Sequence, residues 1–434
     1  MTRIITAAAC TLLLAACEID EELTTVNPNA PSIEAFAENA TVTELNFLVS
    51  GLESEIRDGY ELYVTSTGSV ARELYRIDAD PRNVEDLLEG TIDNNTFYIT
   101  SPYNNAYRVV KSANLLLEAL DNTEAVDEAQ KDGYRGVANT FKAYALQRVA
   151  SMLGSNGIRV DVADPDNLGP FLSESESLQA IEDLYDEAAD QLTGAAFAFQ
   201  LNSGFAGFDS AGTFFEFNRA LAARNHLQQR EFAEAAEAVR ESFYTEGSSP
   251  GVGPAFIFST APGDFLNPLF RVPGNTGNMI FAHPSWFDDA AEGDERVAAQ
   301  VAVRQDTFVR DGLLGIYETR KYPSNTSPIT IVSNEELHLI LAEALAQTDD
   351  GDGAVDLLNI VRSLAGLEEY DGDRDTDSLV DEVLRQRRYS LWMTGQRFSD
   401  LRRYDRLNST FLPIDRPGRD AIATEFPIPL AEGL

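Results

Sequence analysis

Cysteine and histidine are scarce in this chain, and their positions exclude several kinds of site. The 434-residue sequence has two cysteines, Cys10 and Cys17, so the body of the chain can form no disulfide. Its three histidines, His226, His283 and His338, lie far apart and lack the spacing of metal ligands. The sequence also has no Gly-x-Ser-x-Gly motif and no phosphate-binding loop. These absences predict a protein that is not an enzyme.

Long apolar runs and positive charge are lacking as well. After residue 16, no uninterrupted apolar stretch reaches the roughly 18 residues that a membrane-spanning helix needs. With 71 acidic and 33 basic side chains, the formal net charge is −38, which disfavours binding to nucleic acid or to anionic membranes. The 44% hydrophobic and 24% charged content is typical of a globular protein. A length of 434 residues allows one large domain or two ordinary ones.

The N-terminus has the pattern of a bacterial lipoprotein signal. Arg3 precedes an apolar segment, residues 4–14, and Leu-Ala-Ala-Cys at residues 14–17 resembles a lipobox. We therefore expect a signal peptide at residues 1–16 and a lipid on Cys17 as the only link to a membrane. The alternative is an ordinary signal peptide whose cysteine is incidental. An acidic, Pro/Asn-rich linker should follow at residues 17–31.

The body of the chain is predicted to be all-α. Apolar residues recur at helical spacing, and strand-like runs are few and short. The predicted helices are Val42–Arg57, Tyr103–Leu120, Asp127–Leu153, Ser177–Leu192, Phe214–Gln229, Phe232–Phe243, Asn334–Gln347 and Ala354–Leu364. Two segments, residues 220–239 and 337–364, resemble tetratricopeptide hairpins, whose paired helices bury apolar faces by stacking on neighbours. Residues 107–153 form a third, looser pair.

An arginine-rich stretch, Ser378–Tyr404, combines charge with much apolar surface. Ser378 and Asp381 have capping-box spacing, and Gly395 suits the left-handed position after a helix end. A buried guanidinium needs a carboxylate, and Asp400 is the nearest one in the sequence. We therefore predict a structural ion-pair network rather than a catalytic or anion-binding site. Its predicted members are Arg387, Arg388, Arg397, Asp400 and Arg403.

This stretch also resembles the C-terminal signature of the SusD/RagB family of nutrient-binding outer-membrane lipoproteins. The matching residues are Arg387, Arg388, Leu391, Gly395, Arg397, Phe398, Asp400, Leu401, Arg402 and Arg403. Other segments resemble the family in the same order along the chain: Asn-Pro-Asn-Ala-Pro at 27–31, residues 321–345, residues 358–367 and Phe-Pro-Ile-Pro at 426–429. The resemblance implies one SusD-like domain over residues 32–434, with helical repeats on one side and irregular loops on the other.

The family resemblance also implies a function. The protein would sit on the cell surface of the outer membrane, bind a nutrient, most readily a glycan, and pass it to a TonB-dependent transporter of the SusC type. Two other classes stay open from the residues alone. One is an all-α surface glycoside hydrolase, since 71 acidic residues could supply a carboxylate pair. The other is a repeat scaffold that only assembles proteins.

Two candidate ligand sites follow from local patterns. A loop-rich insert at about residues 247–327 concentrates aromatic residues, whose faces can stack on sugar rings. Its candidate ligand contacts are Trp286, Phe287, Tyr317 and Tyr322. Acidic residues further on have nearly the spacing of an EF-hand calcium loop, although Thr376 stands where that loop needs glycine. The candidate calcium ligands are Asp371, Asp373, Asp375, Asp377 and Glu382. We expect no other cofactor.

Overall fold

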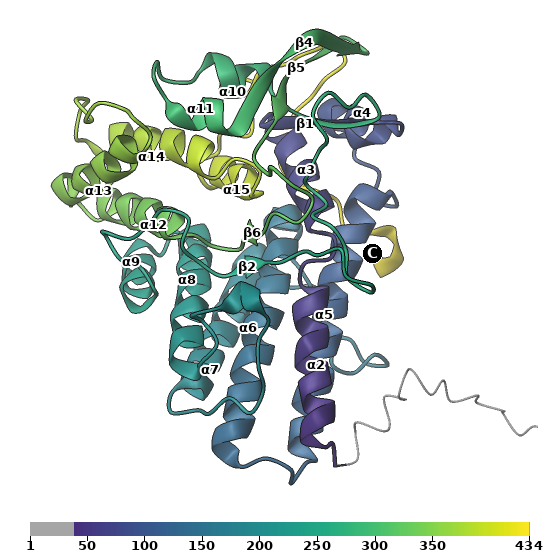
Figure 1. Ribbon diagram of the computed structural model, residues 1–434. Coiled ribbons are helices and arrows are strands. Elements are labelled where there is room, and N and C mark those ends of the chain that lie inside the picture. Colours follow the sequence, from purple (N-terminus) through teal and green to yellow (C-terminus); the bar gives the residue numbers. More distant parts are fainter. Residues whose placement is uncertain (1–38, 434) are drawn as a thin grey trace, which may run out of the picture.

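The computed structural model describes residues 39–433 (Figure 1). Its helices are α2 (Val42–Glu55), α3 (Tyr60–Val70), α4 (Glu85–Glu89), α5 (Phe97–Asp121), α6 (Glu128–Leu153), α7 (Glu174–Leu192), α8 (Ala211–Gln229), α9 (Phe232–Glu241), α10 (Pro284–Asp288), α11 (Glu295–Gln300), α12 (Asn334–Gln347), α13 (Gly351–Leu364), α14 (Thr376–Ser390) and α15 (Gln396–Arg403). Its strands are β1 (Leu74–Asp78), β2 (Ala255–Phe256), β3 (Asn278–Ala282), β4 (Val301–Arg310), β5 (Leu313–Thr319) and β6 (Ile329–Thr330).

The body of the protein is built from helices that pack on their neighbours in the sequence. Extensive contacts join α5 to α6, α6 to α7, α7 to α8, α8 to α9 and α12 to α13. Capping boxes at Thr41, Asp127, Ser173 and Ser210 satisfy the first backbone amides of α2, α6, α7 and α8. The predicted helical body is confirmed. Whether the hairpins α8–α9 and α12–α13 are tetratricopeptide-like stays a prediction.

The helix boundaries agree with the sequence to different degrees. Helix α12 spans the predicted residues, and α2, α6, α7, α8, α9 and α13 differ from the predictions by a few residues. Helix α5 begins at Phe97, six residues before the predicted start at Tyr103. Helix α3 was not predicted, because its sequence contains Gly68 and several Ser and Thr residues that weaken a helical signal. Among residues 39–433, no helix combines the length and apolar character needed to cross a membrane.

An antiparallel sheet, which the sequence did not predict, makes the all-α label too narrow. Its strand order is β1-β3-β5-β4, and β2 and β6 form a separate short pair. The turn between β4 and β5 is Asp311-Gly312, and both residues have positive φ, 52° and 84°, as a tight hairpin requires. The sheet, α10 and α11 lie together at the upper end of the view in Figure 1, beyond the helical body.

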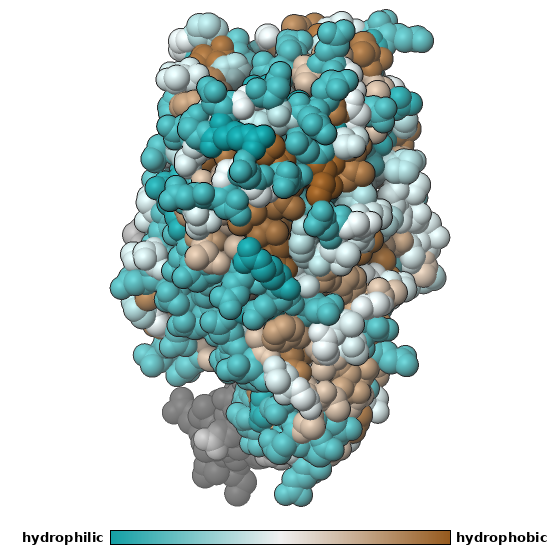
Figure 2. Space-filling view, turned by 90° about the vertical axis from the view of Figure 1, so that its left-hand side faces the viewer, coloured by the Kyte–Doolittle hydropathy of each residue, from teal (hydrophilic) through white to brown (hydrophobic). Residues whose placement is uncertain are grey.

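Apolar side chains form one extended core through the helical body and a small cluster under the sheet. The small cluster packs Tyr75, Ile77 and Phe281 against Leu88 of α4. Most of the face that carries α9, α13 and α14 is hydrophilic, with hydrophobic groups gathered in a hollow in its upper half (Figure 2).

Candidate functional site

Trp286 is a core residue, which corrects its predicted role as a ligand-stacking residue. It belongs to α10, where His283 caps the helix by accepting a hydrogen bond from the backbone amide of Ser285. The Trp286 side chain is 0% exposed, and its ring centroid lies 5.0 Å from that of Trp392. Its indole nitrogen donates to the backbone oxygen of Arg388 at 3.2 Å. A ring enclosed in this way cannot stack on a sugar without unfolding α10.

Tyr322 is also too buried to serve as a stacking platform. Its side chain is 9% exposed and packs in the main core. Burial raises the pKa of its hydroxyl well above the ordinary value. Tyr322 does line a hollow of about 370 Å³, together with Lys321 and Ser390. Tyr322 is therefore no stacking platform, and its predicted contact with a ligand stays a prediction.

Phe287 and Tyr317 form an aromatic pair at the sheet end of the molecule. Phe287 belongs to α10 and Tyr317 to β5, and their rings stack with centroids 4.0 Å apart and planes 10° apart. Both residues are partly exposed, and Val303, the cross-strand neighbour of Tyr317, is 63% exposed. Burial and the nearby charge of Asp288 raise the pKa of the Tyr317 hydroxyl. We call Phe287, Tyr317 and Asp288 the aromatic platform.

The structure brings three of the five predicted network residues together. Arg387 donates to Asp400 at 2.8 Å and Arg403 donates to the same carboxylate at 3.1 Å, with all three side chains buried. Burial alone would raise the pKa of Asp400, but the charges of Arg387 and Arg403 outweigh it and the pKa lies below its usual value. Arg403 also binds Glu343 of α12.

The other two predicted members have different partners. Arg388 donates to Asp289 at 2.8 Å and to the Ser285 hydroxyl at 2.9 Å, so it holds α14 against α10. Arg397 donates to the backbone oxygen of Leu384 at 3.4 Å. Burial and the charge of Arg388 lower the pKa of Arg397 to about 10. Neither Arg388 nor Arg397 makes an ion pair with Asp400.

The predicted calcium ligands do not converge. Helix α14 starts at Thr376 with Asp375 as its cap, instead of the predicted start at Ser378, and Asp375 accepts from the Ser378 backbone amide at 3.1 Å. Glu382 points away into an ion pair with Arg362. Asp371, Asp373 and Asp377 are exposed. Within residues 39–433, no group of three or more acidic, His or Cys side chains could hold a metal ion. The calcium prediction is wrong, because two of the candidate ligands, Asp377 and Glu382, belong to helix α14 and not to a calcium-binding loop.

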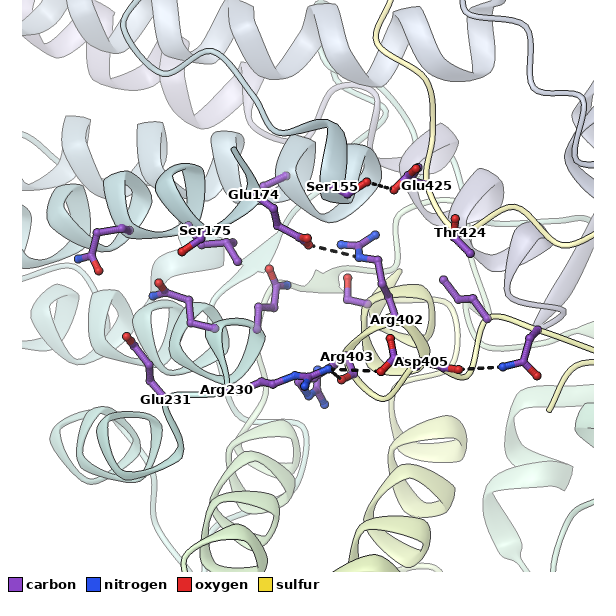
Figure 3. A pocket seen from close by; sticks show the side chains of 18 residues that line it. Ser155, Glu174, Ser175, Arg230, Glu231, Arg402, Arg403, Asp405, Thr424 and Glu425 are labelled. Atoms are coloured by element: carbon purple, nitrogen blue, oxygen red, sulfur yellow. Dashed lines mark hydrogen bonds and ion pairs between the residues drawn. The ribbon is translucent and has the colours of Figure 1, made fainter. Parts of the chain in front are cut away.

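A cavity of about 750 Å³, which the sequence did not predict, lies where α6, α7, α8 and α15 meet the C-terminal segment (Figure 3). Glu174 and Ser175 enter it from the start of α7, and Arg402 enters from the end of α15. Most of the lining residues have polar side chains: they include four carboxylates, three guanidiniums, several amides and hydroxyls, and no aromatic ring. No local motif could have indicated it, because its residues come from five separate segments.

The charged groups around this cavity are already partnered. Arg402 donates to the backbone oxygen of Ser151 at 2.9 Å, and its Nε lies 3.5 Å from a Glu174 oxygen, as Figure 3 shows. Burial lowers the pKa of Arg402 more than the Glu174 charge raises it. Arg230 donates to the backbone oxygen of Arg403. The cavity thus contains charges but no guanidinium without a protein partner.

Cys17, the predicted signal peptide and the predicted linker lie outside the described residues. The lipid anchor, the surface location and the domain boundaries at residues 1–16, 17–31 and 32–434 therefore stay predictions.

Comparison with known proteins gives one family and many solved structures. Residues 335–429 match the model of the SusD family. No curated protein matches. The fold resembles a SusD superfamily protein from Bacteroides vulgatus ATCC 8482, with a TM-score of 0.68, 15% identity and coverage of 90% of this chain and 96% of the other.

Two further similar structures are of proteins described as binding carbohydrate. A laminarin-binding SusD-like protein has a TM-score of 0.67 and 18% identity, with coverage of 91% of this chain and 97% of that one. A SusD-like carbohydrate-binding protein from Bacteroides vulgatus ATCC 8482 has a TM-score of 0.65 and 15% identity, with coverage of 84% of each chain.

These findings first define a class: the chain has a helical SusD-like fold over most of its length. With the C-terminal match added, the resemblance predicted from the arginine-rich motif is confirmed: residues 335–429 match the SusD family model, and the fold of the chain is SusD-like.

Proposed function

We propose that this protein is a lipid-anchored outer-membrane protein that binds a glycan and delivers it to a TonB-dependent transporter of the SusC type. The SusD-like fold supports a binding role, because two of the similar structures are described as binding carbohydrate. The acidic chain, with its net charge of −38, suits an uncharged ligand better than a polyanion.

The observation that carries this proposal is the aromatic platform. Sugar rings offer apolar C–H faces to aromatic rings and hydroxyl groups to carboxylates. Tyr317 and Phe287 stack face to face, so each ring holds the other in place and offers a ligand only the surface that the partner ring leaves uncovered, while Asp288, next to Phe287 in the chain, is an exposed acceptor. Phe287 and Tyr317 keep the ligand-stacking role predicted for the aromatic residues of this insert, whereas the buried Trp286 does not. Transporter contact is proposed for the helical side of the molecule.

The test is glycan binding by the purified protein, measured by isothermal titration calorimetry with laminarin and a panel of neutral plant and bacterial glycans. Tyr317→Ala should weaken binding of the glycan that the wild type prefers about five- to ten-fold, which corresponds to one lost stacking contact. The matched control is Tyr370→Ala, which removes another partly exposed tyrosine in the loop between α13 and α14. It should bind as the wild type does.

The same samples separate the other two classes of protein. A glycan that is bound and recovered intact supports a binding protein. Release of shorter products, measured by chromatography of the incubated glycan, would instead support the glycoside hydrolase. No binding to any glycan, together with stable capture of other proteins, would support the repeat scaffold. Equal affinity of Tyr317→Ala and wild type would exclude the platform as the binding site.

A further inference from the structure

A further hollow, of about 340 Å³, lies between the end of α10, the helices α14 and α15, and the segment that follows α15 (Figure 1). Its lining contains four guanidiniums but only two carboxylates. The whole chain has the opposite balance, with 71 acidic and 33 basic side chains. We call this region of local positive charge the arginine hollow; its charged residues are Arg385, Arg388, Arg397, Arg406, Asp289 and Asp381.

Three of the four arginines have a carboxylate partner in the protein. Arg388 and Arg406 each donate to one of the two lining aspartates. The Nε of Arg385 lies 3.8 Å from an oxygen of Glu382. Both lining carboxylates are therefore neutralised inside the hollow, and the guanidinium of Arg397 is left to be accounted for.

Arg397 makes no ion pair with a carboxylate of residues 39–433. Its Nη1 donates to the backbone oxygen of Leu384 at 3.4 Å, while Asp400 binds two other arginines. The Nε and Nη2 of Arg397 have no hydrogen-bond partner in this part of the chain, and neither atom is enclosed, so a ligand can reach both. Burial and the charge of Arg388 lower the pKa of Arg397 to about 10, as expected for a cation that no close anion balances.

The free edge of Arg397 is the edge that other arginines of this chain use to hold a carboxylate. Arg224 donates from Nε and Nη2 to the two oxygens of Glu336, at 2.7 Å each. Arg403 holds Glu343 in the same way, at 2.8 and 2.9 Å. The two N–H groups of this edge are parallel, and their spacing matches the two oxygens of one carboxylate. The missing partner of Arg397 is thus best matched by a carboxylate.

The size and lining of the hollow limit what carries that carboxylate. A volume of about 340 Å³ lies at the small end of the range for ligand pockets and suits one sugar unit better than a chain. Phe411 lines the hollow and is 50% exposed, with Arg406 over its ring at 5.0 Å from the centroid. An exposed ring suits the apolar C–H face of a sugar. The net charge of −38 repels a polyanion, which favours a ligand with a single negative group.

We propose that the arginine hollow is a second binding site, which takes the carboxylate of one uronic acid unit on the Nε and Nη2 edge of Arg397. The ligand balances the guanidinium charge, and its sugar ring lies beside Phe411. The choice of a sugar rests on the proposed glycan-binding function, whereas the choice of a carboxylate rests on Arg397. The hollow is separate from the aromatic platform, which is built from α10 and β5.

The experiment compares matched monosaccharides on the purified protein. Glucuronate and galacturonate carry the carboxylate, glucose and galactose lack it, and glucose 6-phosphate and glucose 6-sulfate carry a different anion. Affinities are measured by ligand-observed NMR titration at fixed ionic strength. Arg397→Gln removes the charge and the free edge. Arg402→Gln is the matched control, because it removes the same charge from the same helix at a residue that does not line the hollow.

At least one uronate should bind the wild type at least ten-fold more tightly than its neutral counterpart and more tightly than both glucose esters. Arg397→Gln should lose at least ten-fold in affinity for that uronate, and Arg402→Gln should bind it as the wild type does. Asp381→Asn removes a carboxylate that is 63% exposed at the hollow and takes the partner from Arg406. This variant should bind the uronate about two- to five-fold more tightly.

The proposal is overturned if neither uronate binds better than its neutral counterpart, or if folded Arg397→Gln binds the uronate as the wild type does. Tighter binding of either ester than of both uronates also overturns it, since the site would then prefer phosphate or sulfate. If Arg397→Gln does not fold, Asp381→Asn decides, and unchanged or weaker uronate binding by that variant overturns the proposal.

Laminarin, titrated into the same samples, keeps this proposal apart from the proposed function. Laminarin binding that is weakened in Tyr317→Ala, together with no uronate binding, would refute the arginine hollow and leave the platform in place. Uronate binding that depends on Arg397, without binding of any neutral glycan, would support the arginine hollow and count against the platform.

Discussion

Arg403 and Glu343 form a doubly hydrogen-bonded ion pair in the protein interior. The guanidinium donates from Nε and Nη2 to the two carboxylate oxygens at 2.8 and 2.9 Å, and the two side chains are 2% and 0% exposed. The Tyr404 hydroxyl donates to the same carboxylate at 2.8 Å. Because Glu343 lies in α12 and Arg403 in α15, the pair ties the C-terminal motif to the hairpin of α12 and α13.

Asp400 is the second carboxylate of this network, and its removal should be costly. Asp400→Asn leaves Arg387 buried without a negative partner and weakens the contact with Arg403. We expect the free energy of unfolding to fall by about 3–5 kcal/mol, measured by urea denaturation. Asp381→Asn is the matched control and should cost about 1 kcal/mol or less, because Asp381 of α14 pairs with Arg406 while 63% of the Asp381 side chain is exposed. Equal costs for the two variants would contradict the buried network.

Gly395 should tolerate no side chain. It precedes α15 with φ of 82°, and an added Cβ would clash with the ring of Tyr63. Gly418 has nearly the same φ, 81°, and open space around it, so Gly418→Ala should cost only the backbone strain of about 1–2 kcal/mol. Gly395→Ala should cost clearly more, since Tyr63 must move as well. Similar losses in thermal stability for both variants would show that Tyr63 adapts freely.

Glu53 should make the protein less stable as the pH rises from 4.5 to 7. Burial raises the pKa of this carboxyl to about 7, more than its hydrogen bond from the Asn202 amide and the charge of Arg57 lower it. A raised folded-state pKa gives stability that is complete below the unfolded pKa and is lost as the pH passes the folded one.

Glu53→Gln keeps the acceptor for Asn202 and cannot ionise. Relative to wild type, it should therefore gain roughly 1–3 kcal/mol in unfolding free energy between pH 4.5 and pH 8. The measurement is urea denaturation at half-unit steps of pH. Parallel curves for the two proteins would mean that Glu53 titrates normally in the folded state.

Cys17 should carry the membrane anchor. Cys17→Ser removes the thiol to which the lipid would be attached, so the variant should leave the membrane fraction or accumulate as uncleaved precursor. Cys10→Ser, within the predicted signal peptide, is the control and should fractionate as the wild type does. Fractionation on sucrose gradients with immunodetection makes the comparison. A cleaved Cys17→Ser protein that stays in the membrane fraction would remove the lipoprotein prediction.

The helices were the more predictable part of this fold, because their signals are local. The apolar spacing of Asn334–Gln347 and the capping groups before α6 and α7 lie within one or two turns of the helices that they define. The sheet was missed because β1 and β3 are short and distant in sequence, so their pairing at Tyr75 and Phe281 leaves no local pattern. The hairpin turn at Asp311-Gly312 is a local signal for the pairing of β4 and β5.

The sites were predictable only where a short stretch of sequence decides them. Asp400 could be expected as a partner of Arg387 because 13 residues separate them across one turn. Glu343 could not, because 60 residues separate it from Arg403. Trp286 was misjudged because composition marks the surrounding segment as a loop, yet a tryptophan there lowers the free energy most by packing on Trp392. The cavity forms only when distant segments of the chain meet in the folded protein, so no local sequence pattern could predict it.

The most direct test of the account is affinity capture of the tagged, lipidated protein from detergent-solubilised membranes of its own host, followed by mass spectrometry. The account predicts that a TonB-dependent β-barrel co-purifies in near-stoichiometric amount, both with wild type and with Tyr317→Ala, because the platform binds the glycan and not the transporter. Capture of the protein without any such barrel, under conditions in which the lipid anchor and glycan binding are intact, would contradict the proposed delivery function.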